Sequence, residues 1–523
     1  MEIIKTVNIT KKFDNFIANQ DINLSIQSGE IKAIVGENGA GKTTLMNIMY
    51  GLLKPTSGEI YIKGNKVDIN SPTDAIKFGI GMVHQHFKLV PSLTVYENVL
   101  LGIEINKSFL AKKKHIHYPI LDKKEEMRLV QSIIDSYHFD LKADDLLKDL
   151  SIGAKQKVEI VKMLYRDVDI LIFDEPTAVL TPQEIEAFFM TLREMKKEGK
   201  TILIITHKLA EVMEISDSVT VIKQGKVIGN LLTKDTSASH LAQLMVGRDV
   251  LLKIDKNYTN TNSNPVVYEV KNLSTINADG LQVVKDVSFQ IKEGEIVGIA
   301  GVEGNGQSEL LQLLSGLMCS TSGTVFLNET NITNNWPKEL RKKGIGIIPE
   351  DRYIHGLCKE MKITDNLIAG YLDDSSICVH GILSKNKISK KCIGLIQKYD
   401  IRLSDMEGLV SSLSGGNAQK IIISREFDSN PTVLIAAQPT RGVDIGAIEF
   451  IHNSLISLQK KNKAILLISS ELSEIMNLSD RILVMYKGEI IGEVQGKNAL
   501  REDIGLLMAG IRRKDDQTNA SKP

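Results

Sequence analysis

The chain has 523 residues, with 64 Lys and Arg against 64 Asp and Glu, and hydrophobic residues make up 42% of it. A chain of this length is expected to form more than one domain, with two domains of about 250 residues as the natural division. Because the formal net charge is +0, the bulk electrostatics give no reason to expect binding to nucleic acid or to an anionic membrane surface.

The cysteines and the apolar segments exclude further classes. The four cysteines form no C-x-x-C pair, so neither a zinc site nor a disulfide framework is expected, and a reducing compartment fits. The N-terminus lacks the apolar core of a signal peptide. No window of about 18 residues is free of charged and polar groups, so no membrane span is expected. Any connection to a membrane must then come through a partner.

A glycine-rich loop follows the first strands of the chain. Residues 1–30 alternate between apolar and polar positions and predict β-strands, and an apolar run at 31–35 leads into the loop. The loop has the spacing G-x-x-x-x-G-K-[ST], typical of a phosphate-binding loop, because glycines let several backbone N–H groups point at one anion. Lys42 would reach the terminal phosphates, and the Thr43 hydroxyl would ligate Mg²⁺.

An ordinary glycine turn is the alternative for this loop. It is disfavoured because a strand pattern precedes the loop and a helix pattern follows it. The predicted phosphate-binding residues are Gly36, Glu37, Asn38, Gly39, Ala40, Gly41, Lys42, Thr43 and Thr44.

Two later apolar runs, 169–174 and 201–206, predict buried strands of a mostly parallel sheet. The first run ends in two acids: Asp174 can hold Mg²⁺, and Glu175 can orient or polarise an attacking water. His207 follows the second run and would lie near the same sheet edge, where ligands gather in open α/β sheets. Taken alone, His207 is more often a structural or surface histidine than a catalytic one.

The second half of the chain repeats the first. A polar, Asn-rich stretch at 251–265 has the composition of a linker. Beyond it, Gly29 is matched by Gly294 at an offset of 265 (294 − 29), and Ser151 by Ser414 at an offset of 263 (414 − 151). A nearly constant offset through several motifs indicates a duplicated domain. We therefore predict a first domain at 1–250, a linker at 251–265, a second domain at 266–511 and a disordered tail at 512–523.

Two further segments, 150–154 (LSIGA) and 413–417 (LSGGN), complete a family pattern. With the duplicated phosphate loop, they make the chain resemble ABC-transporter ATPase subunits with two fused nucleotide-binding domains, over nearly all of residues 1–510. The resemblance implies an α/β fold of two tandem P-loop NTPase domains packed head to tail. Each would have a mostly parallel sheet core, a β-rich N-terminal subdomain and a helical subdomain. The alternative is that each segment is a Ser/Gly helix N-cap. The two alternatives are physically equivalent, because a helix N-terminus with free N–H groups is itself an anion-binding site.

The resemblance also implies roles for individual residues. Phe13 resembles the aromatic residue that stacks on adenine. Gln85 resembles the Q-loop glutamine that touches Mg²⁺ and water. Asp174 and Glu175 look like the Walker B pair, and His207 like the switch histidine. The segment that resembles the signature, which binds the γ-phosphate of ATP from the opposite domain, consists of Ser414, Gly415, Gly416 and Asn417, and Asp444 resembles the D-loop aspartate.

Both repeats depart from the family pattern. The second repeat has replaced the lysine, the Q-loop glutamine, both acids, the histidine and the adenine-stacking aromatic; the residues now at those positions are Gln307, Glu350, Ala437, Gln438, Ser470 and Ala278. The first repeat keeps these but has a degraded signature and D-loop, namely Ser151-Ile152-Gly153 and Val179-Leu180-Thr181. In a head-to-tail pair every intact part falls in one composite site. The resemblance thus implies one working site and one site that is inert or only holds nucleotide.

This pattern is similar to that of ATPases that couple ATP hydrolysis to import through a membrane transporter. The implied partners are two transmembrane permease subunits and a substrate-binding lipoprotein or periplasmic-type protein, with the ATPase on the cytoplasmic face of the membrane. The segments 84–87 and 436–439 favour nucleosides over sugars as cargo. A ribose- or galactose-type sugar importer is the alternative, and a soluble tandem ATPase acting on ribosomes is a rival from another class. The intact Lys42, Asp174 and Glu175 oppose a non-hydrolysing scaffold.

Overall fold

A computed structural model describes residues 1–14, 16–84, 88–105, 121–177, 180–247, 263–277, 279–302, 304–379, 381–403 and 405–511. The chain divides into two compact units, the first built from Met1–Leu180 and Glu184–Asp249 and the second from Thr181–Gln183 and Val250–Pro523. Most of the predicted linker and all of the predicted tail, 251–262 and 512–523, lie outside the described residues.

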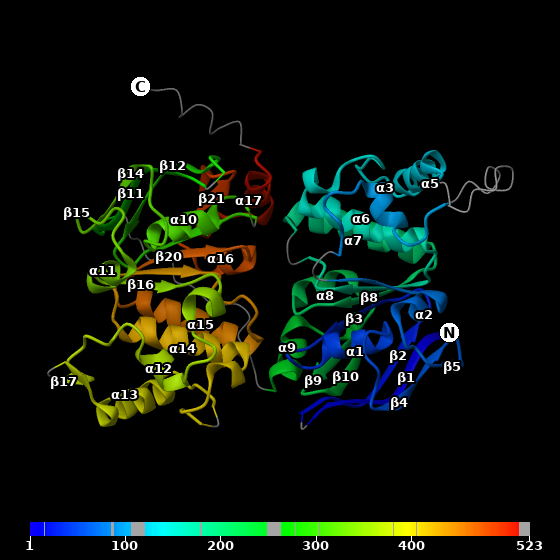
Figure 1. Cartoon of the computed structure of the whole chain (residues 1–523), viewed down its shortest axis with the longest axis horizontal. Helices are drawn as coiled ribbons and strands as arrows, with labels where there is room; N and C mark the ends of the chain where they lie inside the picture. The colour runs from blue at the N-terminus through cyan, green and yellow to red at the C-terminus, as the bar shows by residue number, and fades with distance from the viewer. Residues whose placement is uncertain are drawn as a thin grey trace. The chain divides into compact units, whose positions relative to one another are not determined.

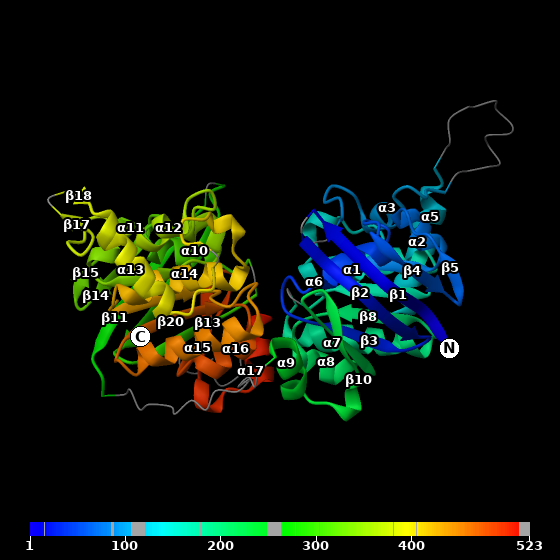
Figure 2. The same cartoon turned by 90° about the horizontal axis from the view of Figure 1, so that it is seen from below.

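The first unit opens with an antiparallel sheet of strand order β2-β1-β4-β5. Its long strands alternate between buried and exposed residues, as expected of a sheet with one face on the core. Figure 2 shows β1 and β2 running side by side as a long ribbon. These strands are β1 (Glu2–Phe13), β2 (Phe16–Gln27), β4 (Ser57–Ile62) and β5 (Asn65–Val67).

A second, mostly parallel sheet forms the centre of this unit, in the order β10-β9-β3-β8-β7-β6. The three central strands are buried along their whole length, which explains their continuous apolar sequences. Only β10, at one edge, runs antiparallel to its neighbour. The strands are β3 (Ile31–Val35), β6 (Ile80–Val83), β7 (Ile170–Asp174), β8 (Thr201–Ile205), β9 (Ser218–Lys223) and β10 (Lys226–Leu232).

Helices cover both faces of this parallel sheet. Figure 1 shows α3, α5, α6 and α7 on one side and α1 with the antiparallel sheet on the other, and each side has its own apolar core. The α-helices are α1 (Lys42–Met49), α2 (Pro72–Lys77), α3 (Val95–Leu100), α5 (Lys123–Ser136), α6 (Ile152–Tyr165), α7 (Pro182–Lys197), α8 (Leu209–Ile215) and α9 (Ala238–Val246). Within the described ranges, no helix is long and apolar enough to cross a membrane.

The second unit repeats this architecture strand for strand. Its antiparallel sheet has the order β12-β11-β14-β15, and its mostly parallel sheet the order β16-β19-β20-β13-β21-β22. The strands of these sheets are β11 (Val266–Ile276), β12 (Gln282–Lys292), β13 (Ile296–Ala300), β14 (Ser322–Leu327), β15 (Thr330–Asn331), β16 (Ile345–Ile348), β19 (Val433–Ala437), β20 (Ala464–Ser469), β21 (Arg481–Tyr486) and β22 (Glu489–Gln495). The predicted α/β class, with two mostly parallel sheet cores, is confirmed.

The helices of the second unit also divide between two cores. They are α10 (Gln307–Leu314), α11 (Pro337–Lys342), α12 (Ile363–Ile368), α13 (Lys385–Lys398), α14 (Gly415–Asp428), α15 (Ile445–Gln459), α16 (Leu472–Leu478) and α17 (Arg501–Met508), with a short hairpin of β17 (Cys378–Val379) and β18 (Ile382–Leu383).

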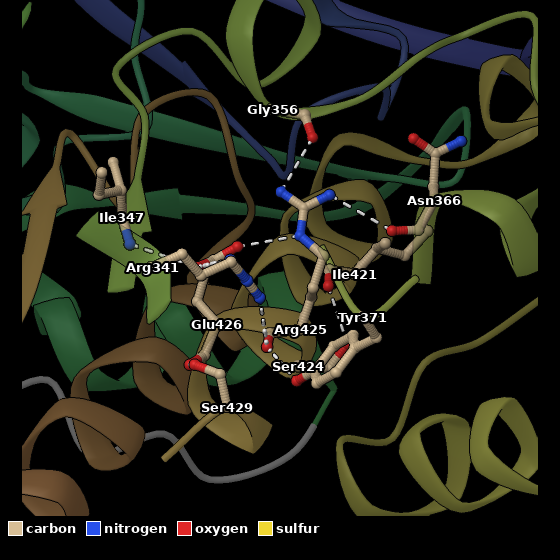
Figure 3. Close-up of polar contacts among 10 residues, drawn as sticks. All are labelled: Arg341, Ile347, Gly356, Asn366, Tyr371, Ile421, Ser424, Arg425, Glu426 and Ser429. Atoms are coloured by element: carbon tan, nitrogen blue, oxygen red, sulfur yellow. Dashed lines mark hydrogen bonds and ion pairs between the residues drawn. The ribbon is translucent and has the colours of Figure 1, made fainter. Parts of the chain in front are cut away.

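A buried ionic cluster anchors α14 in the second unit (Figure 3). The Glu426 carboxylate, 2% exposed, accepts hydrogen bonds from Arg341 Nη1 at 2.7 Å and Arg425 Nε at 2.9 Å. It also accepts one from the backbone N–H of Ile347 in β16 at 3.3 Å. The helices α6 and α14 correspond at an offset of 263 (415 − 152), so the first unit has the apolar Met163 in place of Glu426. The fold itself therefore does not require an ion pair here.

Replacing Glu426 by alanine is expected to destabilise the second unit by about 3–5 kcal/mol, because two guanidinium groups lose a buried carboxylate. The double variant Arg341→Ile/Glu426→Met, which copies the corresponding residues of the first unit, should recover part of this loss. Urea unfolding followed by the fluorescence of Trp336, the single tryptophan of the chain, measures both. Equal unfolding midpoints for Glu426→Ala and the unmodified protein would contradict the prediction.

Candidate functional site

The glycine loop between β3 and α1 is shaped by backbone contacts that leave no room for side chains. A Cβ atom at Gly36 would lie 2.2 Å from the carbonyl oxygen of Ile222, and one at Gly41 would lie 2.4 Å from that of Ala18. Gly41 also has a φ of +99° and caps the N-terminus of α1. These constraints explain the glycines and leave the first N–H groups of α1 at an anion-binding helix end.

Lys42, the first residue of α1, folds its side chain back across this loop. Its Nζ donates to the carbonyl oxygens of Gly36 at 2.7 Å and Glu37 at 2.9 Å. The residue is 6% exposed. Burial lowers the pKa of Lys42, and the nearby carboxylates of Glu175 and Asp174 oppose that shift. The arrangement keeps a cation over the anion-binding end of the helix.

Asp174 closes strand β7 beside the same loop. Its carboxylate accepts a hydrogen bond from the Thr43 side chain, so the two predicted Mg²⁺ ligands in the described part of the site lie together. Burial, followed by the charge of Glu175, raises the pKa of Asp174 to about 6, while Lys42 and Thr43 oppose the shift. A carboxylate and a hydroxyl oxygen are hard ligands of the kind that Mg²⁺ takes, so the residues present fit the ion.

Glu175 and His207 form a direct pair. His207 Nδ1 lies 3.0 Å from Glu175 Oε1, and the Glu175 backbone N–H donates to Ile205 at the end of β8 at 2.9 Å. Burial alone would raise the pKa of Glu175, but the hydrogen bond and charge of His207, with the charge of Lys42, hold it below its ordinary value. A carboxylate that stays ionised beside an imidazole is suited to orient or deprotonate a water molecule.

The corresponding residues of the second unit keep the backbone but lose the charges. Gln438 has a φ of +44°, against +47° for Glu175, and its N–H donates to Ile468 at 2.7 Å. Its Oε1 accepts hydrogen bonds from the N–H and hydroxyl of Ser470, each at 3.2 Å. Gln307, at the position of Lys42, donates to the Ile299 carbonyl at 3.3 Å.

A hollow of about 160 Å³ lies at this place in the second unit. Its lining residues are Gly304, Gln307, Ser308, Leu311, Glu350, Ala437, Gln438 and Ile468. Ser308, the counterpart of Thr43, donates its hydroxyl to Glu350 Oε2 at 2.6 Å, and Ala437 provides no carboxylate where the first unit has Asp174. The hollow therefore lacks the cation and the acids of the first unit.

Each of the two Ser/Gly segments caps the N-terminus of a helix. The residues of the predicted N-cap and those of the predicted anion site are therefore the same. Ser414 Oγ accepts from the N–H of Asn417 at 3.4 Å at the start of α14, and Ser151 Oγ accepts from Ala154 at 3.2 Å at the start of α6. Asp444 caps α15 through the N–H of Ala447 at 2.7 Å. A Cβ at Gly416 would lie 2.9 Å from Asp444 Oδ2, so the structure brings these two predicted residues together.

The remaining predicted residues are only partly described. Phe13, at the end of β1, is 42% exposed, and the Lys11 ammonium lies over its ring at 5.1 Å from the centroid. Gln85, Val179 and Ala278 lie outside the described residues. Sequence reasoning missed Asn19, which is fully buried and donates its Nδ2 to the Gly41 carbonyl at 3.0 Å. The sequence offers one signal for it, a polar Asn within a segment predicted to form strands.

The repeated sheet order, the glycine loop under Lys42 and the paired acid and histidine define an ATP-binding, P-loop ATPase of the ATP-binding cassette class. A family model for ABC transporters matches residues 19–178 and 284–441, more than half of the chain. The chain therefore belongs to the ABC transporter family, as an ATP-hydrolysing member with two cassettes.

Proteins of known role align over almost the whole length. The guanosine import ATP-binding protein NupO of Bacillus subtilis is 47% identical over 98% of this chain and 98% of its own length. The nucleoside import ATP-binding protein NupA of Lactococcus lactis is 44% identical over 97% of this chain and 98% of its own. The ribose import ATP-binding protein RbsA of Yersinia pestis is 37% identical, over 97% of each.

Among solved structures, one chain from the complex of archaeal ribosomal stalk protein aP1 and ribosome recycling factor aABCE1 has a TM-score of 0.62 and covers 97% of this chain and 94% of its own. At 19% identity, this likeness shows the fold alone.

The raised pKa of Asp174 predicts that the stability of the first unit depends on pH when EDTA keeps Mg²⁺ from binding. The folded state holds this proton up to about pH 6, whereas the unfolded state releases it near 3.8, so the free energy of unfolding falls by about 2–3 kcal/mol as pH rises through this range. Asp174→Asn should therefore raise the urea midpoint of the first unit in EDTA, more at pH 7.5 than at pH 5. The pKa of Glu175 is shifted in the opposite direction, so Glu175→Gln should lower the urea midpoint of the first unit at pH 7.5. Equal increases in the urea midpoint for Asp174→Asn at pH 5 and pH 7.5 would contradict the raised pKa of Asp174.

Proposed function

We propose that this chain is the ATPase subunit of a membrane importer of nucleosides and that it hydrolyses ATP at one composite site. The observation that supports this most directly is the contrast between the two units. One pairs an ionised Glu175 with His207 beside Lys42, whereas the other pairs the neutral Gln438 with Ser470.

The composite site follows from a head-to-tail arrangement of domains 1–250 and 266–511, which is part of the proposal. The first domain contributes the phosphate loop, the acids and the histidine. The second contributes its signature, Ser414-Gly415-Gly416, and Asp444. The phosphate loop leads into the N-terminus of α1 and the signature into that of α14, so a phosphate held between them would meet N–H donors from each side.

The residues of the first unit divide the work of hydrolysis among them. The loop N–H groups and the Lys42 ammonium bind the phosphates, and Phe13 stacks on the base. Thr43, Asp174 and the predicted Gln85 hold Mg²⁺, whose charge stabilises the phosphoryl oxygens when it is bound. Glu175 orients the attacking water and takes up its proton, and His207 holds the Glu175 carboxylate in place.

The nucleoside cargo is proposed from the relatives named for guanosine and nucleoside import, which are 47% and 44% identical to this chain. The ribose importer relative at 37% keeps a monosaccharide as the alternative cargo. The partners proposed are two permease subunits and a substrate-binding lipoprotein or periplasmic-type protein, with the chain on the cytoplasmic face of the membrane. Action on ribosomes is supported only by likeness of fold.

Glu175→Gln is expected to lower the ATPase rate of the assembled transporter by at least about 10²–10³-fold, because it removes the one ionised group placed to act on water. Gln438→Ala, the matched change in the second unit, should leave the rate nearly unchanged. Phosphate release by the purified complex measures both. Full activity in the Glu175→Gln complex would rule out the single-site proposal.

The cargo is tested by uptake in cells. Deletion of the gene for this chain should abolish uptake of radiolabelled purine nucleoside, and the unmodified gene, but not its Glu175→Gln version, should restore it. Radiolabelled ribose and galactose serve as controls whose uptake is expected to stay constant. Nucleoside uptake that is unaffected by the deletion, with loss of sugar uptake, would replace the nucleoside with a sugar.

A further inference from the structure

A short segment of the second unit, Glu350–Gly356, connects the degenerate phosphate loop to the start of α14. It follows strand β16, and Arg352–Gly356 forms a single π-helical turn, a conformation found often at functional sites. The Asp351 carboxylate fixes the turn by accepting the N–H groups of Tyr353 at 2.7 Å and Ile354 at 2.9 Å.

Arg352 extends from this turn to two places distant in sequence, the first residue of α14 and the loop that precedes α15. Its Nη1 donates to the Gly415 carbonyl at 2.8 Å, and its Nη2 donates to the Arg441 carbonyl. A Cβ at Gly442 would lie 2.8 Å from Nη2, and one at Gly415 would lie 3.3 Å from Nη1. The planar guanidinium thus fits between two glycines and bridges the signature segment to the segment that leads into Asp444.

The start of the segment is tied to the degenerate loop. Glu350 accepts the Ser308 hydroxyl at 2.6 Å through Oε2 and pairs through Oε1 with Arg441 Nη1 at 3.5 Å. The side chain of Arg441 therefore faces Glu350, while its backbone carbonyl is held by Arg352. These contacts make one polar chain from Ser308 to Gly415.

The end of the segment is tied to the same helix further along. Arg425, in α14, donates from Nη2 to the Gly356 carbonyl at 3.1 Å and from Nη1 to the Asn366 carbonyl at 3.3 Å (Figure 3). The segment is therefore attached to α14 at two places, Gly415 and Arg425, which lie almost three helical turns apart.

We propose that Arg352 is a positioning residue for the signature: it holds Gly415 and the Asp444 loop in one fixed arrangement for the phosphate bound by the first unit. This inference rests on the proposed composite site. Through Glu350 and Arg441, the same contacts attach the signature to Ser308 of the degenerate phosphate loop.

The sequence of the first repeat agrees with this role. At the offset of 265 that relates β6 to β16 (345 − 80), the residue matching Arg352 is Phe87, which cannot donate a hydrogen bond. The same repeat has Ile152 in place of the first signature glycine. The arginine thus accompanies the intact signature and is missing where the signature is degraded.

The test compares Arg352→Ala, Arg352→Lys and a control, Arg501→Ala, in the assembled transporter. Since a misplacement of about 1 Å can cost about 10²-fold in rate, Arg352→Ala should lower kcat by about 10- to 100-fold. ATP affinity, measured by binding in a Glu175→Gln background, should change much less, because the phosphate loop of the first unit is untouched. Arg352→Lys should recover only part of kcat, since one ammonium cannot replace the planar two-donor fork. Arg501→Ala should match the unmodified complex.

Urea unfolding of each variant, followed by Trp336, separates positioning from folding. A kcat for Arg352→Ala within about twofold of the unmodified complex would overturn the inference, as would a loss of kcat that Arg352→Lys fully restores or that follows the loss of stability. The proposed function fails separately, through activity that survives Glu175→Gln.

Discussion

In each unit, the residue that follows one strand of the parallel sheet, β7 or β19, has a backbone conformation that non-glycine residues rarely adopt. The geometry of both sites depends on this conformation. Glu175 and Gln438 have φ values of +47° and +44°, a conformation that costs about 1–3 kcal/mol and persists only where the surroundings enforce it. The adjacent parallel strand does so, because Ile205 and Ile468 accept the two N–H groups. The backbone thus aims the side chain at the residue beyond the next strand, His207 or Ser470, whatever chemistry that side chain carries.

On this shared backbone the two units differ chiefly in charge. The first unit gathers an ammonium, two carboxylates and an imidazole at the carboxyl ends of β3, β7 and β8, and burial and mutual charge interactions shift the pKa values of Lys42, Asp174 and Glu175. The second unit fills the same places with two glutamines, an alanine and a serine, which satisfy their hydrogen bonds locally. Since one preorganised charged group is typically worth about 3–4 kcal/mol in a transition state, this difference in charge is the physical basis of the proposal that only the first unit hydrolyses ATP.

The motif residues were predictable because short spacings fix their geometry: a strand, six loop residues and a helix place Lys42, and a strand end places Asp174. The continuous apolar runs likewise predicted the central strands to within one residue. Arg352 and Asn19 were not predictable, because their partners Gly415 and Gly41 lie on other elements and no local periodicity encodes such contacts.

The cluster around Glu426 gives the second unit buried ionic contacts that the first unit, with Met163 at that place, does not have there. An apolar residue, Met163, serves at the same place in the first unit, so a buried ion pair adds little to stability that packing could not supply. The ionic contacts instead fix geometry. The guanidinium groups of Arg341 and Arg425, with Glu426 between them, hold β16, the π-helical turn and α14 in one arrangement. In the proposed composite site, the second unit presents a helix N-terminus to a phosphate held by the first, and fixed geometry serves that role more directly than added stability does.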